Sequence, residues 1–148
     1  MNDLDSCIRV VIVDDHPWIR EGLRTRLSLA PGLNVVGVVA SGVEALSLAD
    51  AEAPDLMLVD IGMRHMNGIE LTMLLRKRHP SVHVVMLSMY DEREYVISSI
   101  RAGARGYVVK GAPTEELLAA ISAVCAGGSY FTTRVVEAAQ EIGCTDVS

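Results

Sequence analysis

The chain has 148 residues, which is enough for one domain with a short tail. Half of the residues are hydrophobic and only 4% are aromatic, so we expect a core built mainly of aliphatic side chains. The net charge of −6 argues against a nucleic-acid-binding surface. No apolar run reaches the roughly 18 residues that would suggest a membrane span.

The spacing of the cysteines and the residue types at the N-terminus bear on where the protein is located. The three cysteines are far apart and form no Cys-x-x-Cys pair, so neither a zinc site nor a disulfide framework is predicted. The acidic N-terminus does not resemble a secretory signal. We therefore expect a cytoplasmic protein.

Short apolar runs bounded by turn residues predict five buried strands. The most informative run is Leu56–Val59, which continues directly into Asp60. Periodicity alone does not distinguish this strand from a buried helical segment of the same length. The predicted strands are 8–13, 34–39, 56–60, 82–87 and 106–109.

Helical patterns lie between and after these strands. Pro17 suits a first helical turn, and Ser41 with Glu44 forms a capping box. The predicted helices are 17–30, 42–51, 69–78, 91–102 and 114–126, with one more possible over 132–142. This alternation predicts an α/β fold with a parallel sheet and right-handed crossovers.

Functional groups follow four of the five predicted strands, and in a parallel sheet these strand ends share one edge. Each residue has an ordinary explanation when taken alone, as a helix-capping acid, a loop hydroxyl or a surface lysine. Their joint occurrence at successive strand ends is the specific signal. The residues are Asp14, Asp15, Asp60, Ser88 and Lys110.

The three carboxylates of this group predict a metal site. Carboxylates placed close together repel one another and need a cation. Oxygen ligands without a His or Cys grouping favour Mg²⁺, or Mn²⁺, over zinc. The chemistry that follows is phosphoryl transfer to a carboxylate, with Asp60 as the nucleophile and Lys110 and Ser88 stabilising the phosphoryl group.

With these residues in view, the sequence resembles the receiver domains of bacterial two-component response regulators of the NarL/FixJ (LuxR-type) family. The resemblance covers residues 8–135. It rests on residues 11–16, 58–60, 66–68, 87–89, 102–110 and 127–131.

The resemblance implies a flavodoxin-like (CheY-like) three-layer sandwich. Its parallel sheet would have five strands in the order 2-1-3-4-5 and be covered by five helices. Residues 1–127 would form the receiver domain. Residues 128–148 would begin a linker toward a helix-turn-helix DNA-binding domain that is not in this chain.

The resemblance also implies roles at the site. A sensor histidine kinase would phosphorylate Asp60. Asp15, Asp60 and the main-chain carbonyl of Gly62 would bind Mg²⁺ directly, and Asp14 would act through water. The protein would be a phosphoacceptor that assists its own phosphorylation and dephosphorylation rather than an enzyme.

Ser88 and Tyr107 would form the switch pair. Phosphorylation would draw Ser88 inward, and Tyr107 would turn from solvent toward the core. We expect a homodimer on phosphorylation, no DNA binding by this fragment and no membrane association.

The sequence departs from the family pattern at two positions. Arg64 stands where the family often has proline, four residues after Asp60, and His65 follows it. Gly111 follows Lys110 where many receivers have proline. His65, like His16, is expected to be a solvent-facing loop residue rather than a ligand.

Three other readings compete with this one. A flavodoxin would need a phosphate-binding loop after the first strand, where Asp14 and Asp15 would repel the phosphate. A haloacid-dehalogenase-type phosphatase would need a second acid at position 62, which is glycine. A receiver that acts only as a phosphorylation-independent interaction module is the serious alternative, and Arg64 favours it slightly.

Overall fold

The computed structural model describes residues 7–89 and 93–131. The strands are β1 (Ile8–Val13), β2 (Leu33–Val39), β3 (Leu56–Asp60), β4 (His83–Ser88), β5 (Gly106–Val109) and β6 (Tyr130–Phe131). The helices are α1 (Pro17–Ser28), α2 (Gly42–Glu52), α3 (Gly68–Arg78), α4 (Arg93–Ala102) and α5 (Thr114–Cys125). Residues 91–92 of one predicted helix, and the whole possible helix 132–142, lie outside the described residues.

The strands form one parallel sheet in the order β2-β1-β3-β4-β5-β6. This confirms the predicted fold class and the predicted order of the first five strands. The expected number of five strands is wrong, because Tyr130 and Phe131 pair with Gly106 and Tyr107 as a sixth strand. A two-residue strand carries no readable periodicity, which is why the sequence pattern did not reveal it. The sheet thus continues past residue 127, where we expected the linker to begin.

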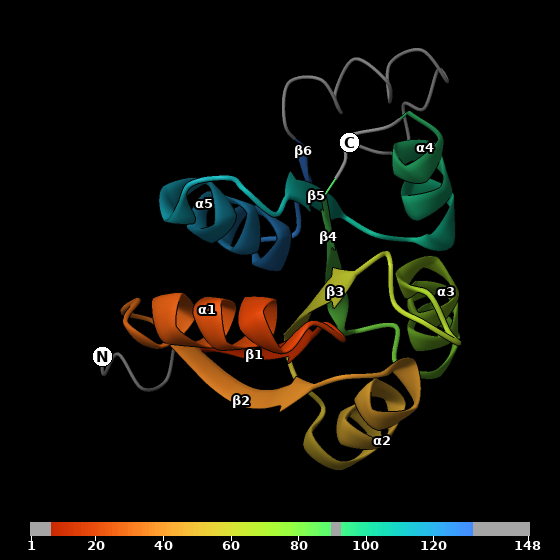
Figure 1. Cartoon of the computed structure of the whole chain (residues 1–148), viewed down its shortest axis with the longest axis horizontal. Helices are drawn as coiled ribbons and strands as arrows, with labels where there is room; N and C mark the ends of the chain where they lie inside the picture. Colours follow the sequence, from red (N-terminus) through yellow and green to blue (C-terminus); the bar gives the residue numbers. More distant parts are fainter. Residues whose placement is uncertain (1–6, 90–92, 132–148) are drawn as a thin grey trace.

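Alternating side chains along the strands form two cores, one on each face of the sheet. On one face, β1 and β3 present Val11, Val13, Met57 and Val59 to α2, α3 and α4. On the other face, their neighbours in the sequence pack against α1 and α5. Figure 1 shows this three-layer arrangement, with α1 and α5 on one side of the sheet and α2, α3 and α4 on the other.

Local capping explains where two helices begin. The Ser41 side chain accepts a hydrogen bond from the main-chain N–H of Glu44 at 3.2 Å, as predicted for α2. A second capping box, formed by Asn67 and Glu70, starts α3. Its Asn-x-x-Glu spacing is readable in the sequence but was not part of our prediction.

None of the helices within the described residues is long and apolar enough to cross a membrane.

Candidate functional site

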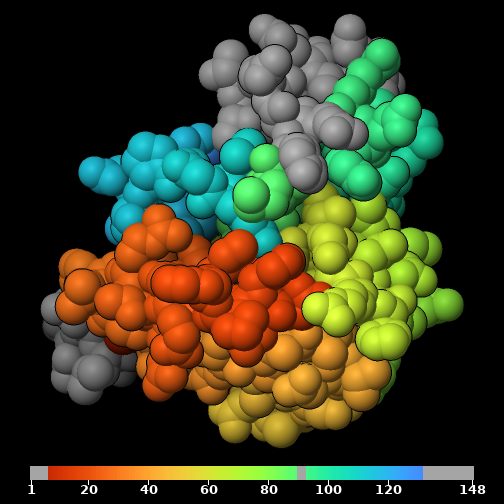
Figure 2. All heavy atoms as spheres, viewed as in Figure 1, coloured from red at the N-terminus to blue at the C-terminus, as the bar shows by residue number. Residues whose placement is uncertain are grey.

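The carboxyl ends of β1 and β3 bring three carboxylates together. Val13 pairs with Val59 in the sheet, so Asp14 and Asp60, the next residues of the two segments, lie side by side. Asp14 is fully buried, and only 3% of Asp60 is exposed. Figure 2 shows the red-orange segment that follows β1 in contact with the yellow-green segment that follows β3.

Lys110 joins the two buried carboxylates from the next residue after β5. Its Nζ lies 2.7 Å from Asp14 Oδ2 and 3.1 Å from Asp60 Oδ1. The main-chain N–H of Lys110 donates to the Ser88 carbonyl oxygen at 2.8 Å, which fixes the position of the chain at this edge. Only 5% of the lysine side chain is exposed, so it acts as a buried cation rather than as a surface charge.

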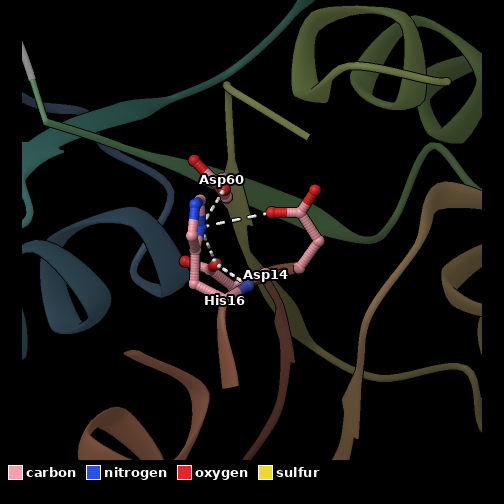
Figure 3. Close-up of side chains that lie close together, drawn as sticks. Asp14, His16 and Asp60 are labelled. Atoms are coloured by element: carbon pink, nitrogen blue, oxygen red, sulfur yellow. Dashed lines mark hydrogen bonds and ion pairs between the residues drawn. The ribbon is translucent and has the colours of Figure 1, made fainter. Parts of the chain in front are cut away.

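His16 belongs to the cluster, although sequence analysis expected it to face solvent. Its ring Nδ1 lies 3.0 Å from Asp14 Oδ1, 3.2 Å from Asp15 Oδ1 and 3.6 Å from Asp60 Oδ2. Figure 3 shows the His16 ring beside the carboxylates of Asp14 and Asp60. The ring is both solvent-accessible, with its side chain 56% exposed, and in contact with the site. Its position directly after Asp15 was the available signal.

Burial and charge repulsion disfavour the ionised form of Asp60. Desolvation raises the pKa of its carboxyl group above the usual range, and the nearby Asp14 raises it further. The N–H of Gly62, which donates to Asp60 Oδ1 at 3.0 Å, and the Lys110 ammonium both lower that pKa. The raising effects prevail. A divalent cation beside Asp60 would favour the ionised form.

The cluster fits a hard divalent cation. One ligand atom from each of Asp14, Asp15, His16 and Asp60 lies within 4.8 Å of the others. Asp15 Oδ1 and Asp60 Oδ2 are buried and accept no hydrogen bond from the described residues. Such buried, unsatisfied carboxylate oxygens are suited to a cation. The predicted role of the Gly62 carbonyl stays a prediction.

The proposed switch residues lie on neighbouring strands beside this cluster. Ser88 ends β4 and is 4% exposed, and Tyr107 in β5 is fully buried. We expected Tyr107 to face solvent before phosphorylation, but this structure already has its ring in the core on the α2–α3–α4 side of the sheet. Burial of a large aromatic ring is favourable in itself, which explains the inward position. The switching role of the pair stays a prediction.

The β3–α3 loop places Arg64 against the cluster. Its main-chain N–H donates to Asp15 Oδ2 at 3.1 Å, and its side-chain Nε lies 3.9 Å from the same oxygen. His65, the next residue, has a φ of 64° in the left-handed region. This loop path cannot be read from the residue types alone.

Comparisons with known proteins agree with this architecture. Residues 10–122 match the response regulator receiver domain family. The transcriptional regulatory protein MctR of Rhizobium johnstonii is 38% identical over 131 residues, which are 88% of this chain and 61% of MctR. The nitrate/nitrite response regulator protein NarL of Escherichia coli K12 is 36% identical over 118 residues, which are 80% of this chain and 55% of NarL.

A solved structure shows the same fold. The two-component response regulator of the LuxR family from Aurantimonas sp. SI85-9A1 superposes with a TM-score of 0.87 at 31% identity, covering 93% of this chain and 99% of that one. The family match spans well over half of the sequence. The chain therefore belongs to the response regulator receiver domain family, among regulators of the NarL and LuxR type.

Proposed function

We propose that this receiver accepts a phosphoryl group on Asp60 from a sensor histidine kinase and acts as a phosphorylation-controlled switch. The observation that supports this most directly is the setting of the Asp60 carboxylate. It ends the central strand, has a buried cation 3.1 Å from one oxygen, and keeps its other oxygen free of hydrogen bonds from the described residues.

The transfer would form one bond and break one bond. The ionised Asp60 carboxylate attacks the phosphorus atom and forms an O–P bond. The bond from phosphorus to the donor breaks, and its electron pair leaves with the donor, an imidazole nitrogen of the kinase or the carboxylate of acetyl phosphate. The side chains of Lys110 and Ser88 would stabilise the transferred phosphoryl group.

Asp14, Asp15 and Asp60 are the residues that would hold Mg²⁺. When bound, the ion would neutralise negative charge on the phosphoryl oxygens. This chain's own contribution is to keep the carboxylates together through Lys110, which contacts both Asp14 and Asp60. Mn²⁺ has the same ligand preference and should substitute.

Mass spectrometry of the intact protein tests the proposal. Incubation with acetyl phosphate and Mg²⁺ should add one phosphoryl group, and Asp60→Asn should abolish the addition. Asp55→Asn, at an exposed position directly before β3, is the matched control and should keep it. Excess chelator should stop the reaction. An unlabelled wild-type protein that is correctly folded would favour the phosphorylation-independent interaction module instead.

We further infer that the receiver controls a transcriptional regulator and forms a homodimer when phosphorylated. The link to a transcriptional regulator is supported by the names of the relatives and by the fact that the chain spans only 61% of MctR and 55% of NarL. The homodimer is what the resemblance to the family implies. The segment after β6 would lead from the receiver toward the output part of such a regulator, and DNA would be bound there. The acidic chain itself, with a net charge of −6, should bind none.

A further inference from the structure

Arg64 contributes a main-chain hydrogen bond to the acidic cluster. Its main-chain N–H donates to Asp15 Oδ2 at 3.1 Å. Proline has no N–H, so Arg64→Pro would remove this bond. The bond engages one oxygen of the carboxylate and leaves the other, the buried Oδ1, within the acidic cluster, where His16 Nδ1 lies 3.2 Å away.

The side chain of Arg64 acts in the opposite direction. Its Nε lies 3.9 Å from Asp15 Oδ2, at the rim of a cluster that holds three carboxylates. The arginine side chain is 86% exposed and the Asp15 side chain only 16%. The guanidinium therefore places a positive charge beside the carboxylate that a cation would use, without closing the site.

We propose that Arg64 sets the metal affinity of this site through two separable groups: its main-chain N–H orients Asp15 for binding, and its guanidinium opposes the bound cation. Arg64 is thus a positioning residue that determines the Mg²⁺ concentration at which Asp60 can be phosphorylated. The inference rests on the proposed function, since it requires that the cluster binds a divalent cation.

A charge series at position 64 tests the guanidinium. Arg64→Lys keeps the charge, Arg64→Gln removes it and Arg64→Glu reverses it, and all three keep the main-chain N–H. Mg²⁺ titration by calorimetry should give a dissociation constant near that of wild type for Arg64→Lys. For an exposed charge near a divalent ion, Arg64→Gln should bind about two- to five-fold more tightly, and Arg64→Glu more tightly again.

Salt provides the internal check on this series. In 0.5 M KCl the Debye length falls to about 4 Å, so the differences between the variants should shrink. Dissociation constants that are equal across the series at low salt would overturn the guanidinium part of the proposal. So would differences that persist unchanged at high salt.

The comparison of Arg64→Pro with Arg64→Gln tests the main-chain N–H. Both variants lack the guanidinium, but only the proline variant lacks the N–H, so it should bind Mg²⁺ more weakly than Arg64→Gln. Equal affinities in two folded variants would overturn this part. If the proline variant does not fold, amide hydrogen exchange decides: the Arg64 amide should be protected in wild type and exchange at least about tenfold faster in Asp15→Ala. An unprotected Arg64 amide in wild type would contradict the proposal.

The same measurements separate a wrong role for Arg64 from a wrong metal site. If wild type binds Mg²⁺ and is phosphorylated but the variants at position 64 behave alike, only the role of Arg64 is wrong. If folded wild-type protein gives no Mg²⁺ binding in the same titration, the metal site itself is wrong.

Discussion

At the scale of single residues, the charge on Asp60 opposes folding when no cation is bound. Burial and the neighbouring Asp14 raise the pKa of Asp60 in the folded protein. A raised folded-state pKa means that folding favours the protonated carboxyl group. Stability from this group is therefore greatest below the unfolded-state pKa and is lost as the pH rises through the folded-state pKa.

Asp60→Asn should consequently stabilise the metal-free protein near pH 7. The asparagine is neutral, and Lys110 keeps its contact of 2.7 Å with Asp14. The melting temperature should rise by about 2–4 °C for each kcal/mol of repulsion and desolvation that is removed. Thermal unfolding in chelator between pH 4 and pH 8 measures this, and the gain should vanish at the acidic end. A gain that is independent of pH would contradict the electrostatic explanation.

The central site residues could be predicted because the end of a buried strand is visible in the sequence. Asp14, Asp60 and Lys110 each follow an apolar run directly, and parallel strands place such positions on one edge. The contacts of His16 and Arg64 could not be predicted in the same way. They depend on how far a ring or a loop N–H reaches across to another segment, and that distance is set by the loop path.

At the scale of elements, the start of α3 is packed directly onto the end of β3. Gly68 donates its main-chain N–H to the Ile61 carbonyl oxygen at 3.0 Å. A Cβ at this position would collide with the Asp60 carbonyl oxygen and lie 2.9 Å from both the Asp60 carbonyl carbon and Ile61 Cα. The glycine therefore allows the helix to approach the strand that carries the phosphorylation candidate.

A pair of Gly→Ala variants should separate this packing effect from helix propensity. Gly68→Ala should destabilise the protein by about 1–3 kcal/mol, because backbone must shift. Gly22→Ala, in α1, meets no atom within 4 Å and should stabilise it by about 0.5–1 kcal/mol. Urea unfolding measures both. Changes of the same sign in the two variants would contradict the packing argument.

A second contact between elements joins α2 to the end of α3. Asp50 Oδ2 lies 2.6 Å from Arg78 Nη2, and Asp50 Oδ1 lies 2.6 Å from His79 Nε2. The hydrogen bond with His79, followed by the Arg78 charge, lowers the pKa of the Asp50 carboxyl group. A lowered folded-state pKa contributes stability above the unfolded-state pKa that is lost as the pH falls through the folded-state pKa.

Asp50→Asn should therefore reduce stability at neutral pH, and the gap to wild type should close in acid. The difference in stability should disappear over the pH range in which the wild-type Asp50 carboxyl group becomes protonated and therefore neutral. The effect should be small because the pair is exposed, and it should weaken with salt. Urea midpoints of the two proteins across this pH range measure it. Equal midpoints at pH 7 would show that the contact adds nothing.

The order of elements was readable from the sequence, and the edge of the sheet was not. Five strands and five helices have clear hydrophobic patterns or capping residues. Their predicted bounds therefore agree with the observed bounds to within a few residues where the structure describes them. Strand β6 is only two residues long and is positioned by pairing with β5 and by the N–H of Tyr130, which donates to the Arg105 carbonyl oxygen at 2.9 Å. Such a strand is created by its neighbours rather than by its own residue pattern.

At the scale of the whole molecule, the strand end beside the site leads directly to an exposed apolar residue. Ser88 ends β4 beside the carboxylate cluster, and the next residue, Met89, is 61% exposed. Tyr95, in α4, is also partly exposed at 39%. A phosphoryl group on Asp60 that draws Ser88 toward it would therefore move the neighbouring exposed residue Met89.

We expect the exposed apolar residues Met89 and Tyr95 to help pair two copies of the receiver when Asp60 is modified. Sedimentation with and without beryllofluoride, a mimic of the phosphoryl group, should show a dimer at least about tenfold tighter with the mimic, or about 1.4 kcal/mol. Tyr95→Ser should weaken that dimer. Trp18→Ser, which removes an exposed aromatic from α1 on the opposite side of the sheet, should leave it unchanged. Because the coupling is reciprocal, the mimic should also bind more tightly at protein concentrations that favour the dimer.

A monomer under both conditions would remove the dimer from the mechanism. A dimer that is weakened equally in both variants would place the interface on another face.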